Sequence, residues 1–148
     1  MRVLIQRISS GSVTVNGAEK RSVGQGLCLL VGIENEDNQE DIEWVVKKVL
    51  NMRIFGDADG KMNLSIQDVY GEVLLVSQFT LHASTKKGNR PSFIKAARPE
   101  TAIPLYEQLI AEMRKEVKVE TGEFGADMDV DIINQGPVTI WIDSKNKE

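Results

Sequence analysis

The sequence is poor in the residues from which many enzyme sites are built. It has one histidine, His82, and one cysteine, Cys28, among 148 residues. A single histidine excludes a two-histidine metal site, and a single cysteine excludes an internal disulfide and the thiolate pairs of zinc sites. Because Cys28 lies in an apolar run from Leu27 to Val31, we expect a small buried hydrophobe there. No ligand cluster suggests a metal, and no cofactor is expected.

Targeting and nucleotide-binding signals are also missing. No apolar run approaches the roughly 20 residues of a membrane span. The start, 1–5, alternates into Gln6 and Arg7 without the apolar core of a signal peptide, so we expect a cytoplasmic protein. The Gly-x-x-x-x-Gly-Lys-Ser/Thr phosphate loop and the Gly-x-Ser-x-Gly elbow of serine hydrolases do not occur.

Positive charge is not in excess, because the formal net charge is -4. A protein that coats nucleic acid is usually basic, so any contact with nucleic acid must come from a local basic patch. The composition is that of an ordinary globular protein, with 41% hydrophobic and 27% charged residues. The length fits one domain, which we assign to residues 1–148.

Apolar patterns predict a sheet and two main helices. Strands are expected at 3–8, 12–15, 27–33, 54–55, 72–79, 117–119, 128–133 and 138–142, with a hairpin turn at Asn16-Gly17. The first helix has the apolar stripe Ile42, Val45, Val46 and Val49, after a capping box formed by Asp37 and Glu40. The second follows Pro99, with Pro104 leaving its start open, and would bury Ile103, Tyr106, Leu109, Ile110 and Met113.

The order of these elements is not a regular βαβ alternation. It predicts an α+β fold with the helices packed on a largely antiparallel sheet. Two helices can cover only part of so much sheet, so a dimer that buries the remainder is expected.

The segment Ser77-Gln78-Phe79-Thr80-Leu81 ends a predicted strand and opens an irregular stretch that continues to Arg98. On an extended strand, Ser77 and Phe79 would share one face, with Gln78 and Thr80 on the other. Hydroxyl and backbone N–H groups at such a strand end could form an oxyanion cradle. Ordinary strand and turn polarity explains the same residues.

Two further segments are open to a functional or a plain interpretation. Lys86, Lys87 and Arg90 lie on the irregular stretch, where they could meet phosphates or simply be solvated. Asn134-Gln135-Gly136-Pro137 precedes the last strand. Its Gly-Pro pair marks an ordinary turn or holds a cis peptide bond, which only X-Pro bonds adopt at modest cost.

At these segments the chain resembles the D-aminoacyl-tRNA deacylase family over essentially its whole length. Ser-Gln-Phe-Thr-Leu at 77–81 and Asn-x-Gly-Pro-Val-Thr at 134–139 match the two signature motifs of that family, and Asn-Arg-Pro-Ser-Phe at 89–93 is typical of it. The resemblance implies a barrel-like homodimer with active sites at the subunit interface. It also implies hydrolysis of D-amino acids, and of mischarged glycine, from tRNA.

The resemblance further implies a filter for handedness built from main chain. Gly136-Pro137 would be cis, would reach into the partner's pocket, and would occupy the space that an L side chain needs. The substrate-binding residues it implies are Ser77, Gln78, Phe79, Thr80, Asn134, Gly136 and Pro137. Phe124 and Met128 would flank the terminal adenine, unless both are core residues. Lys86, Lys87 and Arg90 would contact acceptor-stem phosphates.

For the chemical step we expect water to attack the ester carbonyl. Backbone N–H groups of Phe79 and Thr80 would stabilise the oxyanion, and the ribose 2′-hydroxyl would assist. Thr80 as a nucleophile is the alternative, with His82 as its base if the strand continued. The rival functions are a DNA-binding module and a hydrolase of other small esters.

Overall fold

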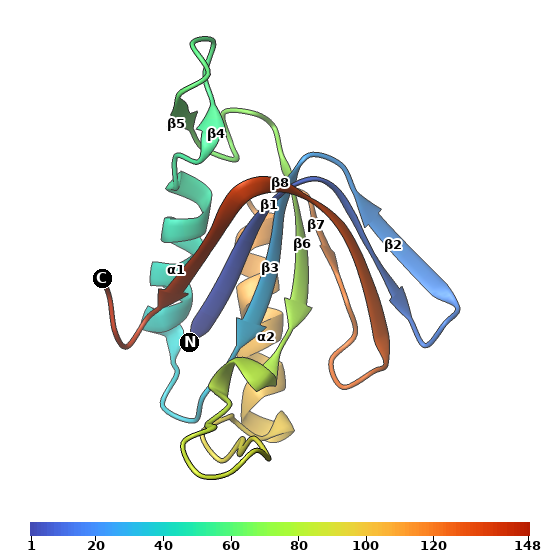
Figure 1. Ribbon diagram of the computed structural model, residues 1–148, viewed down its shortest axis with the longest axis vertical. Helices are drawn as coiled ribbons and strands as arrows, with labels where there is room; N and C mark the ends of the chain where they lie inside the picture. Colours follow the sequence, from blue (N-terminus) through green and yellow to red (C-terminus); the bar gives the residue numbers. More distant parts are fainter.

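The computed structural model describes residues 1–136 and 138–148 (Figure 1). The cis bond expected before Pro137 therefore lies outside the described residues. The strands are β1 (Arg2–Val15), β2 (Glu19–Val23), β3 (Gly26–Gly32), β4 (Phe55–Gly56), β5 (Met62–Leu64), β6 (Glu72–Ser77), β7 (Val119–Thr121) and β8 (Met128–Asp143). The helices are α1 (Gln39–Asn51), the 3₁₀ helix η1 (Phe79–His82) and α2 (Pro99–Arg114).

One curled sheet carries most of the chain, in the order β2-β1-β3-β6-β7 with β8 on β1 (Figure 1). Strand β1 pairs antiparallel with β2, β3 and β8, which confirms the predicted α+β, barrel-like sheet with two main helices. The pairs β3–β6 and β6–β7 are parallel, which the sequence did not indicate. They are parallel because each crossover passes through a helix, first α1 and then α2.

Two apolar layers lie on opposite faces of this sheet. The larger packs β1, β3 and β6 against both helices, with residues such as Leu29, Val45 and Leu109 fully buried. The smaller lies inside the curl and contains Cys28 and Leu74. Burial raises the pKa of the Cys28 thiol to about 11, so it stays protonated at neutral pH. The prediction of a buried, apolar cysteine is confirmed.

Helix α1 has the predicted apolar stripe but begins differently. Its N-cap is Asn38, whose side chain accepts the Glu40 N–H at 2.8 Å, while the Asp41 carboxylate accepts the Asn38 N–H at 2.9 Å. The predicted capping box at Asp37 is therefore wrong by one residue. Asp37 is instead buried, because its carboxylate accepts a hydrogen bond from the Met1 amino group at 2.5 Å.

Helix α2 begins at Pro99 as predicted, with Pro104 inside it. Its fully buried face consists of Ala102, Tyr106, Leu109 and Met113. Ile103 and Ile110 are only half-buried, so the buried stripe is narrower than predicted.

Three strand predictions are wrong in their bounds. The predicted breaks after residues 8 and 133 are absent, because β1 and β8 pair along almost their whole length. Strand β2 was missed, and β7 begins two residues later than the predicted 117–119. Among the helices of residues 1–136 and 138–148, none is both long and apolar enough to cross a bilayer.

Candidate active site

Strand β6 ends at Ser77, and the chain then turns into η1. The Gln78 N–H still donates to the Val31 carbonyl at 2.7 Å, which closes the ladder to β3. The Leu81 N–H then folds back to the Gln78 carbonyl at 3.2 Å. The predicted strand to residue 79 is therefore wrong in its end, because Phe79 already belongs to η1.

The turn into η1 leaves two backbone donors available. Its first internal hydrogen bond comes from Leu81, so the N–H groups of Phe79 and Thr80 precede it, as at any helix start. Within the described residues, neither of them donates to another group of the protein. The Gln78 side-chain amide donates to the Thr80 hydroxyl, which ties the start of the turn together.

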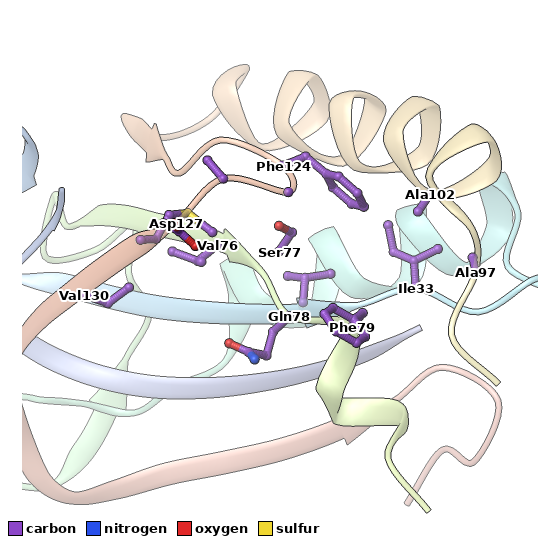
Figure 2. Close-up of a pocket in the computed structure, with 14 residues that line it drawn as sticks. Ile33, Val76, Ser77, Gln78, Phe79, Ala97, Ala102, Phe124, Asp127 and Val130 are labelled. Atoms are coloured by element: carbon purple, nitrogen blue, oxygen red, sulfur yellow. The ribbon is translucent and has the colours of Figure 1, made fainter. Parts of the chain in front are cut away.

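A cavity of about 340 Å³ lies beside this turn, between β6, the start of α2 and the segment before β8 (Figure 2). Its lining is mostly apolar and consists of Val31, Ile33, Val76, Ser77, Gln78, Phe79, Ala97, Ala102, Phe124, Gly125, Ala126, Asp127, Met128 and Val130. The Ser77 hydroxyl points toward Phe124, while Gln78 points to the other side of the chain (Figure 2). A small, mostly apolar cavity with a few polar groups is typical of a ligand site.

Phe124 and Met128 form one wall of the cavity, as expected. The Phe124 ring packs edge-on against Tyr106, with ring centroids 6.0 Å apart. Met128 lies over Gly122, where a Cβ atom would come within 2.3 Å of the methionine sulfur. Both residues also pack on the core, so the two interpretations weighed from the sequence are compatible.

Several residues of the lining were not predicted from the sequence. Asp127 is the one ionisable side chain among them. Its main chain is held by Asn16, whose N–H donates to the Asp127 carbonyl at 2.8 Å and whose side chain accepts the Asp127 N–H at 3.3 Å. Ile33, Ala97 and Ala102 come from three separated segments, so only the fold brings them together.

The strand on which Thr80 and His82 would share a face does not continue past Ser77, so the condition on which their pairing as nucleophile and base depended is not met. His82, the last residue of η1, is 1% exposed, and neither of its ring nitrogens has a hydrogen-bond partner in the described part of the chain. Across residues 1–136 and 138–148, no three His, Cys, Asp or Glu side chains gather in a way that could hold a metal ion.

None of the described residues of the second signature motif, 134–136 and 138–139, lines this cavity in the same chain. Asn134 and Gly136 are exposed, and the Asn134 amide donates to the Arg7 carbonyl at 3.2 Å. The pairing with β1 jumps from Ile8–Asn134 to Gln6–Thr139, so β8 has extra residues between these pairs, as in a β-bulge. A single chain therefore leaves the two motifs apart.

The predicted phosphate-binding residues Lys86, Lys87 and Arg90 are exposed and lie on a loop closed by Ser84 and Ser92. The N–H of each serine donates to the carbonyl of the other, at 2.8 and 2.9 Å. These cations lie on the loop that follows η1 and do not line the cavity itself.

Gly32 is expected to be essential for the position of η1. A Cβ atom there would lie 3.0 Å from both the Gln78 carbonyl oxygen and His82 Cδ2, so Gly32→Ala must shift the turn by a few tenths of an ångström. Misplacement of a catalytic group by 1 Å lowers the rate by about 100-fold, so for this smaller shift we expect kcat to fall about tenfold. Gly24→Ala is the control, since a Cβ there meets nothing within 4 Å. Equal kcat for the two variants would contradict this role.

Known proteins resemble this chain over nearly its whole length. The family model described as D-Tyr-tRNA(Tyr) deacylase matches residues 4–143. D-aminoacyl-tRNA deacylases of Flavobacterium johnsoniae and Bacteroides thetaiotaomicron are 59% and 56% identical to the chain, each over 100% of both proteins.

Solved structures share the fold. A structure titled c-Myc DNA Unwinding Element Binding Protein has 42% identity and a TM-score of 0.90, covering 97% of this chain and 98% of its own. A probable eukaryotic D-amino acid tRNA deacylase has 18% identity and a TM-score of 0.82, covering 95% and 97%, and supports the fold alone. The family match and the full-length relatives together show that the chain belongs to the D-Tyr-tRNA(Tyr) deacylase family, hydrolases of the aminoacyl-tRNA ester bond.

Proposed function

We propose that this chain removes D-amino acids, and mischarged glycine, from the 3′ end of tRNA, with the terminal adenosine and its ester in the cavity beside η1. The observation that carries this proposal is the cavity itself. An apolar, partly aromatic space of about 340 Å³ is lined by Phe79, whose backbone N–H group is uncommitted, as is that of Thr80, the next residue, which does not itself line the cavity. Aromatic and thioether groups such as Phe124 and Met128 suit the face of a base.

The proposed chemistry is attack of water on the ester carbonyl. Water adds to the carbonyl carbon and loses a proton, which gives a tetrahedral oxyanion. The bond to the ribose oxygen then breaks and that oxygen takes up the proton, releasing the amino acid and intact tRNA. The N–H groups of Phe79 and Thr80 would stabilise the charge on the carbonyl oxygen, as backbone donors do in other acyl transfers. The ribose 2′-hydroxyl would assist from the substrate side.

Thr80→Ala tests whether the Thr80 side chain is a nucleophile. The Thr80 hydroxyl already accepts a hydrogen bond from the Gln78 amide, and His82 is buried away from it. We therefore expect a rate loss of less than about tenfold, against the thousandfold or more that follows removal of an essential catalytic group. Single-turnover release of D-tyrosine from tRNA measures it, with exposed Thr85→Ala as the control. A thousandfold loss would support the covalent mechanism.

The selection of handedness is proposed to come from a second copy of the chain. The bulge of β8 exposes Asn134 and Gly136, and neighbouring apolar side chains on β8 are also exposed, with Ile133 at 64% and Trp141 at 48%. Such an uncovered apolar strand is typical of a surface that another protein covers. In the proposed homodimer, carbonyl groups of the partner's Gly136 and Pro137 hold the substrate amino group.

Main chain is suited to this task because it cannot rotate away. An L side chain would collide with the segment that holds the amino group, whereas a D side chain would point to open space. Glycine has no side chain to collide, so its removal is expected under the same proposal. Aminoacyl-tRNA is used in the cytoplasm, so the proposed substrate predicts that this enzyme is cytoplasmic.

Two experiments separate this proposal from its rivals. Comparing D-tyrosyl-tRNA with the ethyl ester of D-tyrosine tests the substrate class, and equal kcat/KM for the two would favour a general esterase. The 42% identical structure is titled a DNA unwinding element binding protein, so DNA binding is the second candidate. Tight, strongly salt-dependent binding of duplex DNA without deacylation would favour it.

A further inference from the structure

We propose that the cations of residues 84–98, here called the basic segment, bind tRNA in two separate zones. An inner zone, Lys95 and Arg98, would hold phosphates of the single-stranded 3′ end at the mouth of the cavity. An outer zone, Lys86, Lys87 and Arg90, would reach the phosphates of the duplex stem. The proposal rests on the proposed function and adds where each part of the tRNA lies.

The charge distribution of the chain singles out this segment. Residues 84–98 contain five cations and no acidic residue, although the chain as a whole has a net charge of -4. Elsewhere carboxylates are interspersed with the cations, and some of these cations form ion pairs, such as Lys118 with Glu72 at 3.1 Å and Lys145 with Asp41 at 2.7 Å. Within the described residues, no cation of the basic segment forms an ion pair. Uncompensated cations on an otherwise acidic protein mark a local site for a polyanion.

The inner zone is fixed to the wall of the cavity. The Ala97 N–H donates to the Ile33 carbonyl at 2.8 Å, and both of these residues line the cavity. The Arg98 carbonyl accepts the N–H groups of Thr101 and Ala102 at 3.0 and 2.9 Å, which begins α2. Because its main chain is held on both sides, Arg98 emerges at a defined place on the cavity rim.

An aromatic contact holds the other side of the inner zone. Phe93 packs edge-on against Phe79, with ring centroids 5.1 Å apart, and Phe79 both lines the cavity and is 54% exposed. Lys95 follows two residues later, on the short stretch between this contact and Ala97. Cations beside an exposed ring are the combination that single-stranded nucleic acid recognises, since bases stack on the ring while phosphates meet the cations.

The outer zone is a separate unit. The paired hydrogen bonds between Ser84 and Ser92 close the loop that carries Lys86, Lys87 and Arg90. Figure 1 shows this part of the chain at the end of the molecule beyond η1, away from the β4–β5 hairpin. A substrate with its ester beside η1 would present its single-stranded end to the inner zone first and its duplex only beyond it.

The test uses two charge-matched double variants and two substrates. The inner variant is Lys95→Gln with Arg98→Gln, and the outer variant is Lys86→Gln with Lys87→Gln. The substrates are D-tyrosyl-tRNA and a D-tyrosyl trinucleotide with the sequence of the tRNA 3′ end. Lys47→Gln with Lys48→Gln on α1 is the control for net charge, since these exposed residues lie outside the site.

The two zones predict different patterns. The inner variant should lose about tenfold or more in kcat/KM on both substrates, mostly through KM, since a charge-assisted contact is lost in each. For this variant, the slope of log kcat/KM against log salt concentration on the trinucleotide should become shallower by about 1.4. Each of the two lost phosphate contacts accounts for roughly 0.7 of that slope in a single strand. The outer variant should lose a similar factor on tRNA and almost nothing on the trinucleotide.

Equal losses from both variants on both substrates would overturn the division into zones, as would an inner variant that matches the α1 control. A wild-type protein that hydrolyses tRNA but not the trinucleotide would overturn the inner zone. A wild-type protein that hydrolyses neither substrate would instead overturn the proposed function.

Discussion

Replacing Gly136 with alanine is expected to lower the hydrolysis of D-aminoacyl-tRNA by 100-fold or more while leaving the folded chain unchanged. Within its own chain, a Cβ on residue 136 would meet only the Asn134 side chain, at an ordinary 3.5 Å. In the proposed dimer the same methyl group would enter the partner's cavity and displace the substrate, and misplacement by 1 Å costs about 100-fold. Single-turnover hydrolysis measures the loss of rate, and thermal unfolding measures whether the folded chain is unchanged.

A mixing experiment shows whether the effect crosses the subunit boundary. The second variant is Ser77→Phe, which fills the cavity under Phe124 toward which Ser77 points (Figure 2). Each variant alone should be inactive. In a mixed dimer, the intact cavity of one subunit receives an intact Gly136 from the other, so random mixing should restore about a quarter of wild-type activity. No recovery from verified mixed dimers would show that the segment acts within one chain or not at all.

Asp37→Asn is expected to destabilise the chain by about 3 kcal/mol, the lower end of the cost of breaking a buried ion pair. The Met1 amino group is fully buried and donates to Asp37 at 2.5 Å and to the Ser144 hydroxyl at 2.8 Å. Asparagine keeps the shape but removes the charge that balances this ammonium group. Thermal unfolding should show a loss of roughly 10 °C in Tm.

The control for this change is Asp129→Asn, an exposed carboxylate on β8. It should change Tm by no more than about 2 °C, since substitutions at exposed positions are usually within 0.5 kcal/mol. A Tm loss for Asp37→Asn no larger than that of the control would mean that the buried pair contributes little. The same Met1 amino group, through its hydrogen bond to Ser144, also joins the beginning of β1 to the end of β8, the two strands between which the register shifts near Gly136.

Periodic apolar patterns predicted the parts of the fold that depend on local burial. The stripe at Ile42, Val45 and Val49 lies in α1, and the run at 27–33 is β3 in the middle of the sheet. The parallel pairing of β6 could not be predicted in the same way, because a buried strand is apolar on both faces whichever direction its neighbours run. The capping box was misplaced by one residue because the sequence offers several acidic and amide side chains in a row.

The sequence motifs predicted some residues of the candidate site, whereas the remaining residues of the cavity lining were not predicted. Ser77, Gln78, Phe79, Phe124 and Met128 line the cavity, whereas Thr80 does not, and their roles toward a substrate stay predictions. The extension of the strand to Phe79 failed because the sequence does not show that Gly32 makes room for a turn. Ala97, Ala102 and Asp127 carry no pattern of their own, since tertiary packing alone brings them to the cavity.

The most direct measurement of the account is the release of tyrosine from D-tyrosyl-tRNA and L-tyrosyl-tRNA by the same protein sample. A cavity that fixes the amino group and ester against rigid main chain predicts that the D form is hydrolysed and the L form is spared by roughly 100-fold or more. Gly136→Ala should lose the D activity without gaining activity on the L form. Hydrolysis of both forms at equal rates would contradict the account, because the cavity would then not distinguish the D substrate from the L substrate.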